Sequence, residues 1–115
     1  MMKKLYGEVE NLAESEYDLA SQQYGATNNS SHESYAVLRE EADEATDEGI
    51  KTELWLNRYW TAVKENDLDK QKAFLKEVHL HALFAACEYI QTAAMAHKAL
   101  ETINHTGSKK SQGEN

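Results

Sequence analysis

Hydrophobic residues recur at helical spacing in the N-terminal part of the chain. Leu5, Val9, Leu12 and Leu19 follow an i, i+4, i+7, i+14 pattern, which is typical of one apolar face of an α-helix. The spacing predicts a first helix over residues 3–24. It is expected to end at the following glycine, because glycine readily adopts the left-handed conformation that caps helices.

A second helix is predicted from residue 32 to about residue 65. Ser30 and Glu33 have the spacing of a capping box, in which two side chains satisfy backbone groups at a helix start. Gly49 inside this segment costs about 1 kcal/mol of helix stability. The same face nevertheless continues from Val37 to Trp55 across the glycine, so we expect one unbroken helix.

The stretch 68–104 contains neither proline nor glycine and consists mainly of strong helix formers. Asp67 is the expected N-cap, after a tight turn at Asn66. A helix of this length spans roughly 55 Å, whereas a compact domain of this size has a radius of gyration of about 13–14 Å. Its middle is apolar nearly all round, which is typical of a helix buried on more than one side. We therefore expect it to pack against a second chain as well.

Together these elements predict an all-α fold. The N-terminal helix packs on a long antiparallel helical hairpin, and a second chain completes an oligomeric helical bundle, as a dimer or a tetramer. Residues 1–105 are expected to form a single domain, and the polar segment 106–115 to be disordered.

Charge and composition exclude several function classes. The formal net charge of −8 and the absence of a basic cluster argue against binding to nucleic acid or to an anionic membrane. No apolar run is long enough for a membrane span, and the first 20 residues are too acidic for a signal peptide. The single cysteine, Cys87, suits a reducing compartment. We expect a soluble cytoplasmic protein.

Acidic residues interrupt the apolar seam of the predicted hairpin. Folding the two long helices about residues 66–67 pairs Trp55 with Val78 and Tyr59 with Phe74. The acidic residues then fall level with one another farther along the hairpin, and these are Glu41, Glu44 and Glu88, with Gln91 beside them.

Carboxylates gathered in this way repel one another, and the pKa of each is raised unless a cation is present. Oxygen ligands of this kind suit Mg²⁺, with Mn²⁺ as a possible substitute. We therefore take Glu41, Glu44 and Glu88 as candidate metal ligands, with Gln91 and Glu48 as weaker candidates. Two alternative interpretations remain open: the glutamates of the second helix form a solvated acidic face, or Glu88 pairs with a Lys or Arg.

Two further groups have alternative interpretations. Trp55 and Tyr59 are candidates for stacking on a nucleotide base, but aromatic residues at helical spacing also pack in cores. Glu77 and His81 are four residues apart, so they form either an ordinary intrahelical pair or part of an auxiliary site.

Two segments resemble a known family. Residues 32–44, HESYAVLREEADE, and residues 88–99, EYIQTAAMAHKA, are similar to segments of MazG-like all-α nucleoside triphosphate pyrophosphohydrolases, in particular the small phage-encoded forms. The resemblance implies that an ExxE pair and an ExxD pair bind Mg²⁺, which orients a nucleoside triphosphate for hydrolysis to the monophosphate and pyrophosphate. Glu41 and Glu44 would be the ExxE pair, and Glu88 the first acid of the ExxD pair. Gln91 stands where the family has aspartate, and the spacing from Glu44 to Glu88 is longer than usual.

Two functions are therefore expected. The first is a Mg²⁺-dependent pyrophosphohydrolase, located in the host cytoplasm if the protein is phage-encoded. The alternative is a catalytically inactive oligomeric module of the same fold that binds a nucleotide or a host protein. Gln91 and the extended hairpin favour the alternative. If the alternative holds, the substitution Gln91→Asp is expected to restore metal binding.

Overall fold

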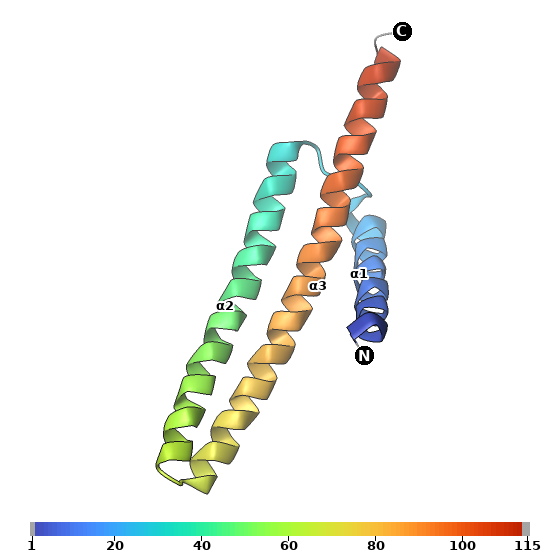
Figure 1. Cartoon of the computed structure of the whole chain (residues 1–115). Coiled ribbons are helices and arrows are strands. Elements are labelled where there is room, and N and C mark those ends of the chain that lie inside the picture. Colours follow the sequence, from blue (N-terminus) through green and yellow to red (C-terminus); the bar gives the residue numbers. More distant parts are fainter. Residues whose placement is uncertain (1, 114–115) are drawn as a thin grey trace. The chain divides into compact units, whose positions relative to one another are not determined.

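The computed structural model of the chain contains three α-helices and no strand among the residues that it describes, which are 2–113 for the backbone and 2–106 for the side chains (Figure 1). Helix α1 spans Met2–Tyr24, α2 spans Ser31–Lys64 and α3 spans Leu68–Gly113. The all-α prediction is confirmed. Within the described range, no helix is both long and apolar enough to cross a membrane.

The end of α1 and the start of α2 follow their predicted signals. Gly25 has φ 92°, and its N–H donates to the carbonyl of Ser21 at 2.9 Å. The Ser30 hydroxyl accepts a hydrogen bond from the N–H of Glu33 at 3.1 Å, as a capping residue should. The Glu33 carboxylate accepts from the amide of Asn29 at 3.0 Å, so this loop is tied to the first turn of α2.

A tight turn joins α2 to α3. Asn66 has φ 55°, a left-handed conformation that asparagine tolerates well, and this reverses the chain. Asp67 then caps α3, because its carboxylate accepts a hydrogen bond from the N–H of Lys70 at 3.0 Å. Helix α2 continues through Gly49, as predicted. A Cβ added at Gly49 would meet nothing within 4 Å, so no close contact requires a glycine there.

Helix α3 extends farther than the sequence predicts. Its backbone remains helical to Gly113, through most of the segment for which disorder was expected. Residues 114–115 lie outside the described residues.

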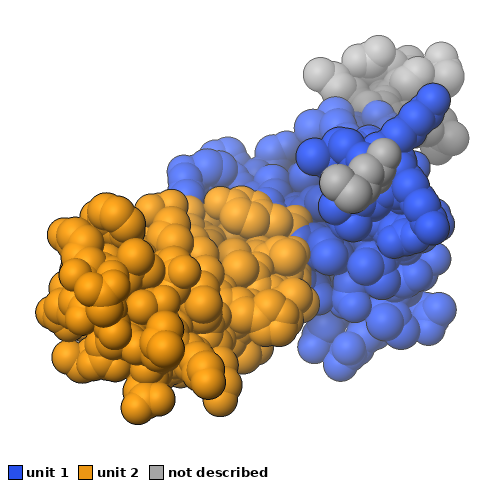
Figure 2. Space-filling model, turned by 60° about the horizontal axis from the view of Figure 1, so that its bottom comes forward, with its two compact units in different colours: residues 1–41, 90–115 blue, residues 42–89 orange. Residues whose placement is uncertain are grey.

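The chain divides into two compact units (Figure 2). Unit 1 combines residues 1–41 with residues 90–115, and unit 2 is the continuous segment 42–89. The expectation of a single domain over residues 1–105 rests on chain length and stays a prediction.

Unit 1 contains α1, the loop after it, the first turns of α2 and the second half of α3. The loop is anchored by Thr102, whose hydroxyl accepts a hydrogen bond from the N–H of Asn28 at 2.8 Å and donates to the carbonyl of Lys98 at 2.7 Å. The Tyr17 ring of α1 stacks on His97 of α3, with centroids 3.8 Å apart. Side-chain contacts therefore hold both α1 and the loop against α3.

Unit 2 is the helical hairpin around the turn. Its fully buried hydrophobic residues are Ala45 and Ala62, while the larger apolar side chains are at best half-buried. Trp55 packs at a tilt against Phe74, with ring centroids 5.6 Å apart. The pairing of Trp55 with Val78 stays a prediction. Helix α3 was expected to be covered on more than one side, yet in this single chain Phe84 remains 45% exposed.

Candidate functional site

Two of the predicted metal ligands meet in unit 2. Glu44 projects from α2 and Glu88 from α3, and a carboxylate oxygen of one lies within 4.8 Å of a carboxylate oxygen of the other. The tight turn at Asn66 sets the level of the two helices and so brings these distant residues together. Two acidic oxygens at this separation can bind a single divalent cation between them.

The pKa of Glu44 is raised above its ordinary value of 4.5. The first cause is a hydrogen bond shared with Glu88, which requires a proton on one of the two carboxyl groups. Partial loss of solvent and repulsion from the charges of Glu88 and Asp47 act in the same direction. Glu44 therefore lies where negative charge is in excess, and a cation would relieve that excess.

Glu41 and Gln91 are both half-buried residues of unit 1. Glu41 lies one turn before Glu44 on the continuous helix α2, so both carboxylates reach the same side of that helix. Gln91 follows Glu88 by three residues on α3. The ExxE and ExxQ spacings therefore each occupy one helical turn.

Gln91 has a structural partner that the sequence did not reveal. Its amide group donates a hydrogen bond to the Glu16 carboxylate of α1 at 2.7 Å. An aspartate at position 91 has no proton to donate at neutral pH, and it would place a second negative charge beside Glu16. The expectation that Gln91→Asp simply restores a metal ligand therefore omits a cost in unit 1.

Gln91→Asp is expected to lower the free energy of unfolding at pH 7 by about 1–2 kcal/mol, because a charge-assisted hydrogen bond becomes a carboxylate repulsion. Urea unfolding followed by circular dichroism measures this change. Adding Glu16→Gln to the variant should recover most of the loss, since the amide and the carboxylate then exchange places. Equal stability of Gln91→Asp and wild type would show that the Glu16 contact contributes nothing.

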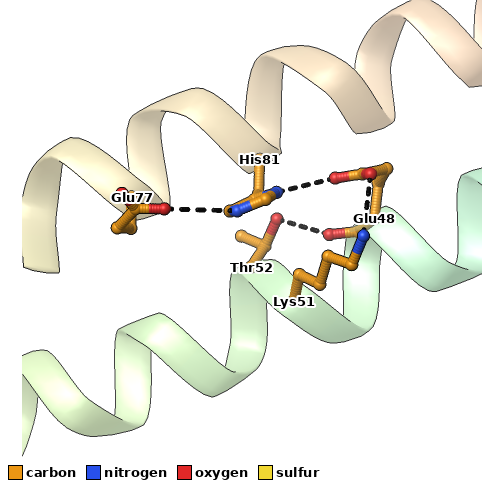
Figure 3. A network of polar contacts seen from close by, with 5 residues as sticks. All are labelled: Glu48, Lys51, Thr52, Glu77 and His81. Carbon is orange, nitrogen blue, oxygen red and sulfur yellow. Dashed lines mark hydrogen bonds and ion pairs between the residues drawn. The ribbon is translucent and has the colours of Figure 1, made fainter.

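Glu48, the weaker candidate ligand on α2, belongs to a separate network in unit 2 (Figure 3). One of its carboxylate oxygens lies 2.8 Å from Nδ1 of His81, and the other lies 3.3 Å from the ammonium group of Lys51. Nε2 of His81 lies 3.3 Å from the Glu77 carboxylate. The hydrogen bond with His81 is the largest cause that holds the pKa of Glu48 below its ordinary value of 4.5. The structure thus gives Glu48 cationic and imidazole partners.

Removing the His81 imidazole is expected to change the acid sensitivity of the chain. A carboxyl group with a lowered folded-state pKa stabilises the fold above its unfolded pKa, and this contribution is lost as pH falls through the folded-state value. His81→Ala removes the contact that lowers the pKa of Glu48. The variant should therefore lose less stability than wild type as pH falls below 4.5, where Glu48 takes up its proton. Thermal unfolding between pH 7 and pH 3 tests this, with the exposed His79→Ala as control. Identical pH profiles for His81→Ala and wild type would contradict it.

The two candidate stacking residues have packing contacts. Trp55 lies against Phe74, and the guanidinium carbon of Arg58 lies 4.6 Å from the centre of a Trp55 ring. Tyr59 is half-buried one turn farther on. Trp55 follows Glu44 by three helical turns, about 16 Å along the axis. The contacts of Trp55 indicate that it packs in the hairpin, and Tyr59 is established only as half-buried.

Unit 1 contains a cavity of about 550 Å³ that sequence reasoning did not find. Helix α1, the following loop, and the unit 1 parts of α2 and α3 all line it. Its polar lining includes Glu41 and Gln91, and also Lys98, which is only 7% exposed. The volume lies within the range of about 300–1,000 Å³ that is usual for small-molecule pockets.

Comparison with known proteins identifies no relative. No protein-family model, no curated protein and no solved structure matches the chain.

Proposed function

We propose that Glu41, Glu44 and Glu88 bind a divalent cation, Mg²⁺ or Mn²⁺, and that the chain is a nucleoside triphosphate pyrophosphohydrolase of the MazG-like type. The observation that carries the proposal is the pairing of Glu44 with Glu88 between α2 and α3, with the raised pKa of Glu44. Glu41, one turn before Glu44, supplies a third carboxylate on the same side of α2. Hard oxygen donors of this kind suit Mg²⁺.

The proposed reaction is hydrolysis of a nucleoside triphosphate to the monophosphate and pyrophosphate. Glu41, Glu44 and Glu88 would hold the cation, which would supply neutralisation of phosphate charge and a bound water of lowered pKa. The cavity that Glu41 lines has room for a nucleotide. The segments that resemble the MazG-like family, residues 32–44 and 88–99, contain these same glutamates.

Calorimetric titration of the full chain with Mn²⁺ tests the proposal. We expect saturable binding of one cation per chain, followed by pyrophosphate release when nucleoside triphosphates and Mg²⁺ are supplied. Absence of saturable binding would refute the metal assignment. Binding without turnover of any nucleoside triphosphate would refute the enzymatic assignment and favour the second candidate.

The second candidate is a catalytically inactive helical module that retains the cavity and binds a nucleotide or a protein. One observation favours it: the side chain of Gln91 is held by Glu16, so this position stabilises the contact between α1 and α3. Gln91 then serves packing between the two helices. This role does not require the negatively charged metal ligand that the family pattern has at the fourth position.

We also infer that two copies of the chain associate through unit 2. Ile50 and Leu54 share one side of α2, while Leu80, Leu83 and Phe84 lie along one side of α3. Counted from the contacting rings of Trp55 and Phe74, helical spacing turns Leu54, Leu80 and Phe84 by about 80–120° toward the same side of the hairpin, which we call the apolar face. All five side chains are between 41% and 61% exposed.

A second copy is the occupant that best suits the apolar face. The fully buried hydrophobic side chains of unit 2 are two alanines, which is a small core for a helical hairpin. Packing two such faces together would bury six large side chains in a four-helix arrangement, which is a common solution for amphipathic helices. A two-fold symmetric pair uses the same face twice and closes on itself.

A further inference from the structure

The ammonium group of Lys98 is the unexplained charge of unit 1. Lys98 lies on α3 and is only 7% exposed. Among the described residues, no hydrogen bond or ion pair joins Nζ of Lys98 to another side chain. Removing a charge from water without a partner is costly, and natural proteins pair such groups with an opposite charge or a ligand.

The geometry directs this ammonium group toward the cavity. Lys98 is one of the residues that line it. Within the described part of the chain, the hydroxyl oxygen of Ser21 is the side-chain polar atom that is both fully enclosed and without a hydrogen-bond partner. Nζ of Lys98 also lacks a partner but does not meet that description, so it is not fully enclosed by protein. The buried stem of Lys98 therefore supports a charge that remains accessible from the cavity.

The surrounding contacts make the cavity a fixed structure. Thr102 accepts the N–H of Asn28 and donates to the carbonyl of Lys98, so the loop and the lysine are tied to the same turn of α3. The amide of Asn28 donates to the hydroxyl of Ser34, which is also buried. A ligand would thus meet a wall that already has its shape, which lowers the entropy cost of binding.

We propose that this cavity receives the phosphate chain of a nucleotide and that Lys98 is its phosphate ligand. The choice of a nucleoside triphosphate rests on the proposed function, whereas the phosphate-binding role rests on the lysine. A lysine ammonium is a compact donor suited to phosphate oxygens. Tyr24, Val37 and Met95 give the cavity an apolar lining for the nucleoside.

Two carboxylates of the same cavity determine how the anion binds. Glu33 is held by the amide of Asn29, and Glu41 lies on α2. With Lys98 they give the lining a charge of −1, which repels a free phosphate. A divalent cation at Glu41 would reverse that sign, so binding of the triphosphate is expected to depend on the metal as well as on Lys98.

Lys98→Met tests the proposal, because methionine has a similar length without the charge. The probe is a non-hydrolysable α,β-methylene nucleoside triphosphate, titrated by calorimetry with Mg²⁺ present. We expect its dissociation constant to rise at least about tenfold, the size expected for the loss of one charge-assisted hydrogen bond. Lys98→Arg should retain most of the affinity, and Lys4→Met, an exposed lysine of α1, should behave as wild type.

Two further measurements separate binding from folding and from the metal site. In the absence of ligand, Lys98→Met should keep the midpoint of thermal unfolding close to that of wild type, because Nζ lies at the cavity and is not sealed in the interior. A large decrease would show a purely structural role for Lys98. Mn²⁺ titrated alone should bind Lys98→Met as it binds wild type.

The possible outcomes are distinct. Equal affinity of wild type and Lys98→Met for the analogue, with Mn²⁺ binding intact, overturns the role of Lys98 and leaves the proposed function standing. Lys98-dependent binding of the analogue in EDTA supports the phosphate site while overturning its dependence on the metal. Loss of Mn²⁺ binding and of analogue binding in wild type overturns both.

Discussion

Replacing Glu44 with glutamine is expected to abolish turnover and, in the same variant, to stabilise the metal-free chain at neutral pH. Because the folded-state pKa of Glu44 is raised, its contribution favours the fold at low pH and is lost as pH rises through that value. At pH 7 the ionised pair of Glu44 and Glu88 is therefore unfavourable. Glutamine is uncharged and can donate a hydrogen bond to Glu88, so it removes the repulsion.

The same substitution removes a charged metal ligand, so the dissociation constant for Mn²⁺ should rise at least about tenfold, equivalent to 1.4 kcal/mol. Calorimetry measures the affinity, and thermal unfolding in EDTA measures the stability. Glu53→Gln is the matched control, since it removes one negative charge from an exposed position of α2 in the same unit. Full pyrophosphate release by the Glu44→Gln variant would refute the assignment of Glu44.

Leu54→Glu is expected to convert the dimer into a monomer of 13.0 kDa. Leu54 lies on the apolar face and is 45% exposed in the single chain. In a two-fold interface the substitution enters twice, and each copy would bury a carboxylate against leucine and phenylalanine side chains without a partner. Light scattering after size exclusion measures the mass.

Leu56→Glu gives a closely matched control for that experiment. Leu56 is 44% exposed on the same helix, but two residues of helix turn it about 200° away from the side of Leu54. We expect this variant to retain the dimer mass. Dissociation by Leu56→Glu alone would place the interface on the other side of the hairpin, and a monomeric wild type would refute the association.

The three helices, and their ends up to the start of α3, were predictable because their causes are local. Gly25 ends α1 through its own backbone conformation, and the capping hydrogen bond of Ser30 spans three residues. The continuity of α2 through Gly49 was also readable, since the pattern of apolar and acidic positions keeps one phase on both sides of the glycine.

The candidate metal site was predictable to the level of one helical turn. A short turn sets which residues of α2 and α3 face each other, and this brings Glu44 to Glu88. Two further contacts across the hairpin, between Trp55 and Phe74 and between Glu48 and His81, depend on how individual side chains pack and were not predicted.

The cavity and the Gln91 contact depend on tertiary packing and so were missed. Glu16 and Gln91 are 75 residues apart, and no local pattern links an amide on α3 with a carboxylate on α1. The buried state of Lys98 likewise follows from the placement of the loop that Thr102 anchors. The sequence shows a lysine in an amphipathic helix, where exposure is the usual outcome.

The division into two units has a consequence for the order in which the chain folds. Unit 2 is contiguous, and its helices meet through a short turn, so forming it closes short loops. Unit 1 is interrupted, and its hydrogen bond between Asn28 and Thr102 joins residues 74 positions apart. Closing that long loop in an unfolded chain has a large entropy cost, which a preformed hairpin reduces by shortening the path between residues 41 and 90. We therefore expect the contiguous unit to form first and to serve as the nucleus for the interrupted one.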